Sequence, residues 1–349
     1  MTEASTEPQP LLRVQDVRKE FPTHRREVVR AVDGVSLEVR KGETLGLVGE
    51  TGCGKSTLAR CIAHLYDVTS GSVWFDGNEL TGLSRRAMRP LRREIQMIFQ
   101  DPYGSLNPRR RVGSIIGDPF AIHGISKGAE RKKRVQELME LVGLNPEHYN
   151  RFPSDFSGGQ RQRIGVARAL ALRPKLVICD EPVSALDVSI QAQIINLLAD
   201  LQKDFDLTYV FISHDLSVVR HVSDRIAVMY LGKLIEVSPT DDLFEQTRHP
   251  YTRALLSALP VADPDTADSR EQIILAGDIP SATNPPQGCR FHTRCPKARA
   301  DCVASEPPLE PVFDDDPAHR TACFFPLTIG EDLSTAVPEL LDLPDREAS

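Results

Sequence analysis

The chain has 349 residues, of which 40% are hydrophobic and 26% charged, and its formal net charge is −7. These values are ordinary for a globular protein of about two domains, and they exclude a disordered or fibrous chain. The charge is uneven, because residues 261–349 carry 17 acidic and 7 basic side chains, which leaves 32 and 35 for residues 1–260. Neither part has a strong basic excess, so we expect no nucleic-acid partner.

No segment predicts export or a membrane span. The chain begins with the polar stretch MTEASTEPQP, which lacks the pattern of a signal peptide. No apolar run approaches the ~18 residues that a spanning helix needs. Seven cysteines, an odd number, give no indication of a disulfide framework in a chain of this length. We therefore expect a cytosolic protein, or one that reaches a membrane only through a partner.

Short apolar runs followed by helical stretches predict an α/β fold with a parallel sheet. Residues 11–17 and 35–39 have the pattern of strands, and the alternation in the second indicates one solvated face. Three further runs are mainly apolar and end at glycine or polar residues, as buried parallel strands do: 44–48, 176–179 and 208–212.

The segment GETGCGKS at 49–56 follows the first buried run and matches the pattern of a phosphate loop. Its glycines allow backbone N–H groups to surround phosphate oxygens, and they are Gly49, Gly52 and Gly54. Lys55 brings a positive charge to the terminal phosphates, and the Ser56 hydroxyl can ligate Mg²⁺. The helix that begins here, which includes Thr57, points its positive end at the same anion.

Between about residues 100 and 172 the pattern becomes mostly helical, which predicts a helical subdomain inserted into the α/β core. Residues 130–143 carry apolar side chains at helical spacing with basic residues between them. The buried run at 176–179 then ends in Asp180 and Glu181. Asp180, beside the phosphate loop, can hold Mg²⁺ through its water shell, and Glu181 can orient or deprotonate a water molecule.

The segment FSGGQ at 156–160 gives the chain its resemblance to the ATP-binding cassette ATPases, whose signature sequence is LSGGQ. Phe156 stands where the family usually has leucine. Gln100 in IFQDP, Asp187 in SALD and His214 in FISHD match three further motifs of that family, in the family's order. The resemblance implies that Gln100 contacts Mg²⁺, that Asp187 lies at the nucleotide, and that His214 contacts the γ-phosphate. It thereby implies an ATP hydrolase with a P-loop core.

The signature segment also has the chemistry of an anion site, because it opens a helix with a serine and two glycines. In the family that the chain resembles, ATP lies between the phosphate loop of one subunit and the signature of the other. The resemblance therefore implies a head-to-tail dimer in which four residues serve the partner's ATP: Ser157, Gly158, Gly159 and Gln160. Phe21 is the aromatic residue best placed to stack on adenine, although a core or surface role fits it as well.

After residue 260 the composition changes again, since ten of the 26 prolines and four of the seven cysteines lie between residues 264 and 326. This predicts three parts: an ATP-binding domain at 10–260, a loop-rich module at 261–326 and an acidic tail at 327–349. Three stretches resemble the dipeptide/oligopeptide importer ATPases, a branch that also serves nickel uptake: 99–109, 249–260 and 284–296.

The resemblance to that branch implies uptake of di- or oligopeptides at the cytoplasmic face of the cell membrane. It also implies the partners: two permease chains, a second ATPase that is identical or a paralogue, and an extracytoplasmic solute-binding protein. Two alternatives stay open, import of nickel or another small solute, and a soluble ATPase of the same class acting on DNA or ribosomes. The second usually carries two cassettes or a long coiled coil, and the sequence has neither.

The four late cysteines admit three interpretations, and they are Cys289, Cys295, Cys302 and Cys323. They can be free thiols, a zinc site or the ligands of a [4Fe–4S] cluster. The absence of a C-x-x-C pair disfavours zinc. The resemblance to the peptide branch favours the iron–sulfur cluster, which is the expectation we carry forward.

Overall fold

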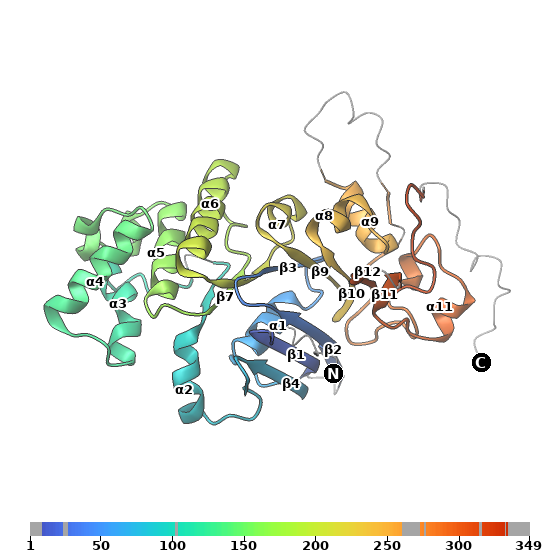
Figure 1. Ribbon diagram of the computed structural model, residues 1–349, viewed down its shortest axis with the longest axis horizontal. Coiled ribbons are helices and arrows are strands. Elements are labelled where there is room, and N and C mark those ends of the chain that lie inside the picture. Colours follow the sequence, from blue (N-terminus) through green and yellow to red (C-terminus); the bar gives the residue numbers. More distant parts are fainter. Residues whose placement is uncertain are drawn as a thin grey trace, which may run out of the picture.

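The computed structural model describes residues 9–23, 27–101, 104–259, 273–275, 277–313, 316–331 and 333. The segment at 261–272 and most of the acidic tail expected at 327–349 lie outside the described residues. Figure 1 shows a central sheet that runs across the molecule, with a smaller sheet below it and a group of helices at one end. The phosphate loop lies where the two sheets approach each other around α1.

The central sheet has eight strands in the order β11-β12-β10-β9-β3-β8-β7-β6. Five adjacent strands of this sheet are parallel to one another: β9 (Arg225–Tyr230), β3 (Thr44–Val48), β8 (Thr208–Ile212), β7 (Leu176–Asp180) and β6 (Ile95–Ile98). Three of them, β3, β7 and β8, are the buried runs expected from the sequence. Because parallel strands point the same way, their carboxyl ends gather the loop at 49–54 and the acids at 180–181 on one edge. The α/β fold with a parallel sheet is confirmed.

The smaller sheet is antiparallel, with the strand order β2-β1-β4-β5. Its strands are β2 (Val28–Val39), β1 (Leu12–Pro22), β4 (Ser70–Phe75) and β5 (Asn78–Glu79). Helix α1 (Lys55–Ile62) packs between the two sheets, since its Leu58 shares one apolar core with Val14 of β1 and Leu47 of β3. This packing fixes the axis of α1, and with it the direction in which the phosphate loop faces.

Helices occupy the end of the molecule where the sequence predicts a helical subdomain (Figure 1). They are α3 (Val112–Ile122), α4 (Gly128–Leu141) and α5 (Gly158–Leu170), with α6 (Val188–Phe205) beside them. The helix expected at 130–143 is α4, displaced by two residues. The other helices of the described residues are α2 (Arg85–Glu94), α7 (Leu216–Val222), α8 (Thr240–Glu245), α9 (Pro250–Ser257) and α11 (Ala300–Ala304), with short 3₁₀ turns at Pro146–Asn150, Pro153–Asp155 and His292–Arg294. Among the described residues, no helix combines the length and the apolar character needed to cross a membrane.

The C-terminal segment contributes two strands that the sequence did not predict. β12 (Asp316–Thr321) pairs antiparallel with β10 (Lys233–Pro239), and β11 (Glu310–Phe313) pairs with β12. The loop-rich segment after residue 273 therefore continues the central sheet. Beside this joint Glu236 is wholly buried and accepts hydrogen bonds from the backbone N–H groups of Arg248 and His249.

Unfolding should depend on pH through His249, which caps α9 by accepting a hydrogen bond from the Tyr251 N–H at 3.1 Å. Burial lowers the pKa of His249 to about 4. The unfolded chain takes up this proton near its ordinary pKa of 6.5, so the free energy of unfolding should fall as the pH drops from about 7 to about 4, by up to ~1.4 kcal/mol per unit. We expect urea titrations at pH 7.5 and pH 5.5 to show this loss in the parent chain.

The matched variant is His249→Asn, which keeps an acceptor for the Tyr251 N–H but does not titrate. Its loss of stability between the two pH values should be smaller than that of the parent. An equal loss in the two chains would show that His249 is not the group responsible.

Candidate functional site

The backbone of the phosphate loop is shaped for close approach, and two of its glycines are indispensable for steric reasons. Gly54 has φ 108° and precedes α1, and a β-carbon there would lie 2.0 Å from the carbonyl oxygen of Ala31. At Gly49, with φ 149°, a β-carbon would lie 2.1 Å from the carbonyl oxygen of Met229. Gly52 has φ 85° and open space where a β-carbon would lie, so glycine is favoured there only because the backbone is left-handed.

Lys55 is buried, and its ammonium group lies inside the loop. Its Nζ donates to the carbonyl oxygens of Gly49 at 2.7 Å and Glu50 at 3.0 Å. These carbonyl groups hold the ammonium within the phosphate loop, next to the backbone N–H groups that begin α1. The arrangement places one positive charge and a helix N-terminus together, which suits the terminal phosphates of a nucleotide.

Ser56 and Asp180 meet across the gap between α1 and the end of β7. The Ser56 Oγ donates to Asp180 Oδ1 at 2.6 Å. Burial raises the pKa of Asp180, and the Ser56 hydrogen bond opposes that shift. A hydroxyl and a carboxylate side by side are the oxygen donors that Mg²⁺ prefers, and a cation here would favour the ionised carboxylate that burial disfavours. The residues present therefore fit a magnesium ion.

Two residues far apart in the sequence, Gln100 and His214, converge at Glu181. The Gln100 Nε2 donates to Glu181 Oε2 at 2.7 Å, and His214 Nδ1 lies 3.3 Å from the same oxygen. Glu181 itself has φ 47°, a left-handed backbone in a residue other than glycine, and its N–H donates to the Ile212 carbonyl oxygen. Such a backbone persists only where the surroundings enforce it.

The signature segment forms the start of α5, as its sequence predicts. Ser157 and Gln160 cap the helix reciprocally: the Gln160 N–H donates to Ser157 Oγ at 3.4 Å, and the Ser157 N–H donates to Gln160 Oε1 at 3.0 Å. A β-carbon at Gly159 would lie 2.4 Å from Cγ2 of Ile190, so this glycine is needed for packing against α6. Among the described residues, no hydrogen bond or ion pair joins residues 157–160 to residues 49–56.

Two further candidates, Asp187 and Phe21, make local contacts in this structure. Asp187 caps α6 by accepting from the Ile190 N–H at 3.0 Å, and the Ser189 hydroxyl, with this backbone bond, lowers the pKa of Asp187. Phe21 packs edge-on against Tyr66, with ring centroids 5.6 Å apart. Tyr66 was not predicted, and its place soon after the end of α1 was the available indication. For Asp187 and Phe21, a contact with the nucleotide stays a prediction.

Tyr251 and Arg294, which hold Glu50 at the second position of the phosphate loop, were also not predicted from the sequence. Its backbone N–H donates to the hydroxyl of Tyr251 at 3.0 Å. Its carboxylate forms a two-point ion pair with Arg294, with N–O distances of 3.0 and 3.2 Å. A carboxylate inside a loop that binds phosphate is unfavourable without a cation beside it. The presence of Glu50 in the loop therefore indicated that a basic residue pairs with it.

The expectation of a [4Fe–4S] cluster is wrong. All four cysteines line one small cavity, but the part of the chain that the structure describes holds no group of three or more His, Cys, Asp or Glu residues placed to bind a metal ion. Burial raises the pKa of Cys289 to about 11, and the pKa values of Cys295 and Cys323 to about 12. Iron and zinc bind the thiolate, so a metal ion here would have to displace the protons of these three thiols. The residues do not fit an iron–sulfur cluster or a zinc ion.

Two family models match the chain. The model described as "ABC transporter" matches residues 32–184, and the model described as "Oligopeptide/dipeptide transporter, C-terminal region" matches residues 235–302. Among curated relatives, an oligopeptide transport ATP-binding protein of Bacillus subtilis is 52% identical over 93% of this chain and 99% of its own length. A probable peptide ABC transporter ATP-binding protein of Sinorhizobium fredii is 51% identical over 87% of each chain.

Solved structures give the same result for the fold. An ATP-binding cassette, solved as a dimer in a post-hydrolysis state with ADP and Pi, superposes with a TM-score of 0.61 at 30% identity, over 66% of this chain and 98% of the other. A subunit of an ABC transporter complex from Clostridium perfringens gives a TM-score of 0.60 at 26% identity, over 68% and 92% of the two chains. The superposed region is the size of one cassette.

Proposed function

The chain belongs to the ABC transporter ATPases, in the branch of the oligopeptide transport ATP-binding proteins, and from this premise we propose that it powers the uptake of di- or oligopeptides through separate permease chains. The observation that carries the proposal is the convergence of Gln100 and His214 on Glu181, next to Asp180 and Ser56. A full set of hydrolytic residues favours a working ATPase over a module that only binds ATP. The names of the relatives support peptides as the cargo.

In this proposal the phosphate loop binds ATP through its backbone N–H groups and Lys55. Ser56, Asp180 and Gln100 would hold Mg²⁺, which supplies positive charge to the phosphates when bound. The Ser56–Asp180 hydrogen bond keeps the two oxygen donors adjacent in its absence. We propose that Phe21, which packs against Tyr66, stacks on the adenine ring.

Glu181 acts as the general base for the attacking water. His214 and Gln100 both contact its Oε2 atom, so they orient the carboxylate and lie next to the group that it would act on. We assign His214 to the γ-phosphate, because half of its side chain is exposed on the side of the site that is open to solvent. Proton transfer to a positioned carboxylate contributes about 10²- to 10⁴-fold to the rate of such a reaction.

We further propose that two ATPase subunits form a head-to-tail dimer, in which Ser157, Gly158, Gly159 and Gln160 of one subunit meet the ATP held by the other. The N–H groups at the start of α5 suit an anion, and among the described residues no hydrogen bond or ion pair joins them to the phosphate loop, which supports this arrangement. The other proposed partners are two permease chains and an extracytoplasmic solute-binding protein, at the cytoplasmic face of the membrane. We also propose the division into an ATP-binding domain at 10–260 and a C-terminal module at 261–326.

The test is to purify a Glu181→Gln chain with ATP from the membranes of the source cells and to identify the proteins that accompany it. We expect two permease chains, a second ATPase and a solute-binding protein, which can then be screened with peptides and with nickel. The control carries Lys55→Ala in addition and should recover less of the second ATPase. Recovery of ribosomal or DNA-repair proteins without any membrane chain would contradict the transport proposal.

A further inference from the structure

The phosphate loop carries a negative charge of its own, the carboxylate of Glu50. Its backbone carbonyl accepts a hydrogen bond from Lys55, so the residue lies within the part of the loop that is to meet the triphosphate. Its side chain is 23% exposed, which leaves it only partly hydrated. An unpaired carboxylate at this place would repel the phosphates and weaken the attraction of Lys55 for them.

Arg294 supplies the opposite charge from a distant part of the chain. It lies at the end of the short 3₁₀ turn His292–Arg294, and its guanidinium meets both oxygens of Glu50, with an exposed fraction of only 9%. Burial disfavours the charged form of Arg294, but the hydrogen bonds that it donates to Glu50 and Tyr230 outweigh this effect and raise the pKa of Arg294. A two-point pair of this kind fixes orientation as well as charge.

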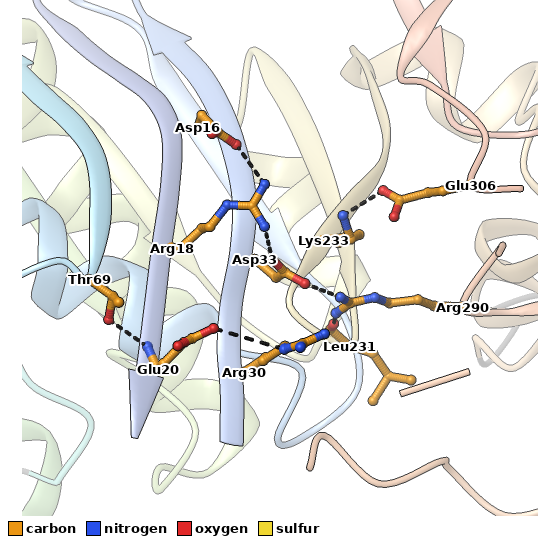
Figure 2. A network of polar contacts seen from close by, with 10 residues as sticks. All are labelled: Asp16, Arg18, Glu20, Arg30, Asp33, Thr69, Leu231, Lys233, Arg290 and Glu306. Carbon is orange, nitrogen blue, oxygen red and sulfur yellow. Dashed lines mark hydrogen bonds and ion pairs between the residues drawn. The ribbon is translucent and has the colours of Figure 1, made fainter. Parts of the chain in front are cut away.

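The turn that carries Arg294 is itself fixed to the core. Phe291 packs edge-on against Tyr230 and Tyr251, with ring centroids 5.4 Å apart in each pair. Four residues before Arg294, the buried Arg290 pairs with Asp33 of β2 and donates to the Leu231 carbonyl oxygen. Figure 2 shows Arg290 reaching from the C-terminal segment to Asp33, which Arg18 contacts from the other side. The backbone that carries Arg294 is thus held in place by contacts that do not involve Glu50.

We propose that Arg294 is a positioning residue of the nucleotide site: it neutralises and orients the Glu50 carboxylate, so that the phosphate loop presents only positive charge and N–H dipoles to ATP. The C-terminal segment then completes the phosphate site of the same chain. The affinity for nucleotide therefore depends on whether Arg294 is paired with Glu50. This inference rests on the proposed role of residues 49–56 in binding ATP.

The test is the dissociation constant of the full-length chain for the magnesium complex of the non-hydrolysable analogue AMP-PNP, measured by titration calorimetry. Arg294→Gln leaves the Glu50 carboxylate unpaired, so we expect the dissociation constant to rise about tenfold. Arg294→Lys keeps the charge but loses the second hydrogen bond, and should raise it less. The double variant Glu50→Gln, Arg294→Gln removes both charges and should return the constant to within about threefold of the parent value.

The recovery of affinity in the double variant separates charge neutralisation from a purely structural role of Arg294. If Arg294 only held the fold together, removing the Glu50 charge as well would not restore the affinity. The matched control is Lys297→Gln, which breaks the ion pair of Lys297 with Glu331 in the same segment and should leave the constant unchanged. If Arg294→Gln lowers thermal stability but not affinity, or if the double variant binds as weakly as Arg294→Gln, the inference is wrong. If Arg294→Gln does not fold, Arg294→Lys and the double variant decide between the same two outcomes.

The reference variant Lys55→Ala distinguishes a failure of this inference from a failure of the proposed function. If Lys55→Ala still binds the analogue as the parent does, the assignment of residues 49–56 is wrong and the inference falls with it. If Lys55→Ala loses binding while Arg294→Gln keeps it, only the inference is wrong.

Discussion

Glu181→Gln should reduce the steady-state rate of ATP hydrolysis at least 100-fold while the chain still binds ATP. Glutamine keeps the size of the side chain and its acceptor oxygen, so Gln100 can still donate to it, as it does at 2.7 Å in the parent. What is lost is the capacity to take a proton from water, which contributes about 10²- to 10⁴-fold in positioned carboxylates. The measurements are the rate of phosphate release and the dissociation constant for ATP.

A buried acid at the opposite edge of the same sheet provides the control. Glu43 pairs with Arg225 near the start of β3, with an N–O distance of 2.9 Å, and it lies away from the phosphate loop. Glu43→Gln should lower stability and leave the rate per folded chain within about twofold of the parent value. A Glu181→Gln chain that turns over within fivefold of the parent would show that another group activates the water.

Much of this site could be predicted because its chemistry is local in the sequence. The run at 44–48 forms β3 with the same bounds, since a short, mainly apolar run before a glycine-rich loop is typical of a buried parallel strand. Asp180 and Glu181 end β7 for the same reason. Ser157 and Gln160 are three residues apart, the spacing of a capping box, so the start of α5 could be predicted from the signature alone.

What could not be predicted depends on contacts between residues far apart in the chain. The pairing of β12 with β10 brings Thr321 opposite Glu236, and no periodicity in a proline-rich segment indicates that register. Arg294 and Glu50 meet across a separation of 244 residues. The sequence shows that four cysteines are clustered between 289 and 323, but not how their thiols are oriented, and for that reason the cluster predicted there was wrong.

Lys55→Ala should raise the dissociation constant for ATP at least about 30-fold, because it removes the only lysine of the segment 49–56. Hydrogen bonds to charged groups contribute about 1.5–3 kcal/mol each, and ~2 kcal/mol corresponds to about 30-fold in affinity. In the structure the Lys55 ammonium is held by the carbonyl oxygens of Gly49 and Glu50, so it is already at the mouth of the loop before nucleotide arrives. The measurement is an equilibrium titration with ATP, in parallel with the thermal unfolding midpoint.

Lys175→Ala is the matched control, since Lys175 precedes β7 at the other edge of the sheet and pairs with Asp76 and Glu94. It removes the same charge and should leave the affinity for ATP unchanged. The comparison separates a specific contact with phosphate from the general effect of one positive charge on an anionic ligand, which is screened beyond about 10 Å at ordinary ionic strength. If both variants weaken binding equally, the affinity depends on net charge, and the assignment of Lys55 to the phosphates is wrong.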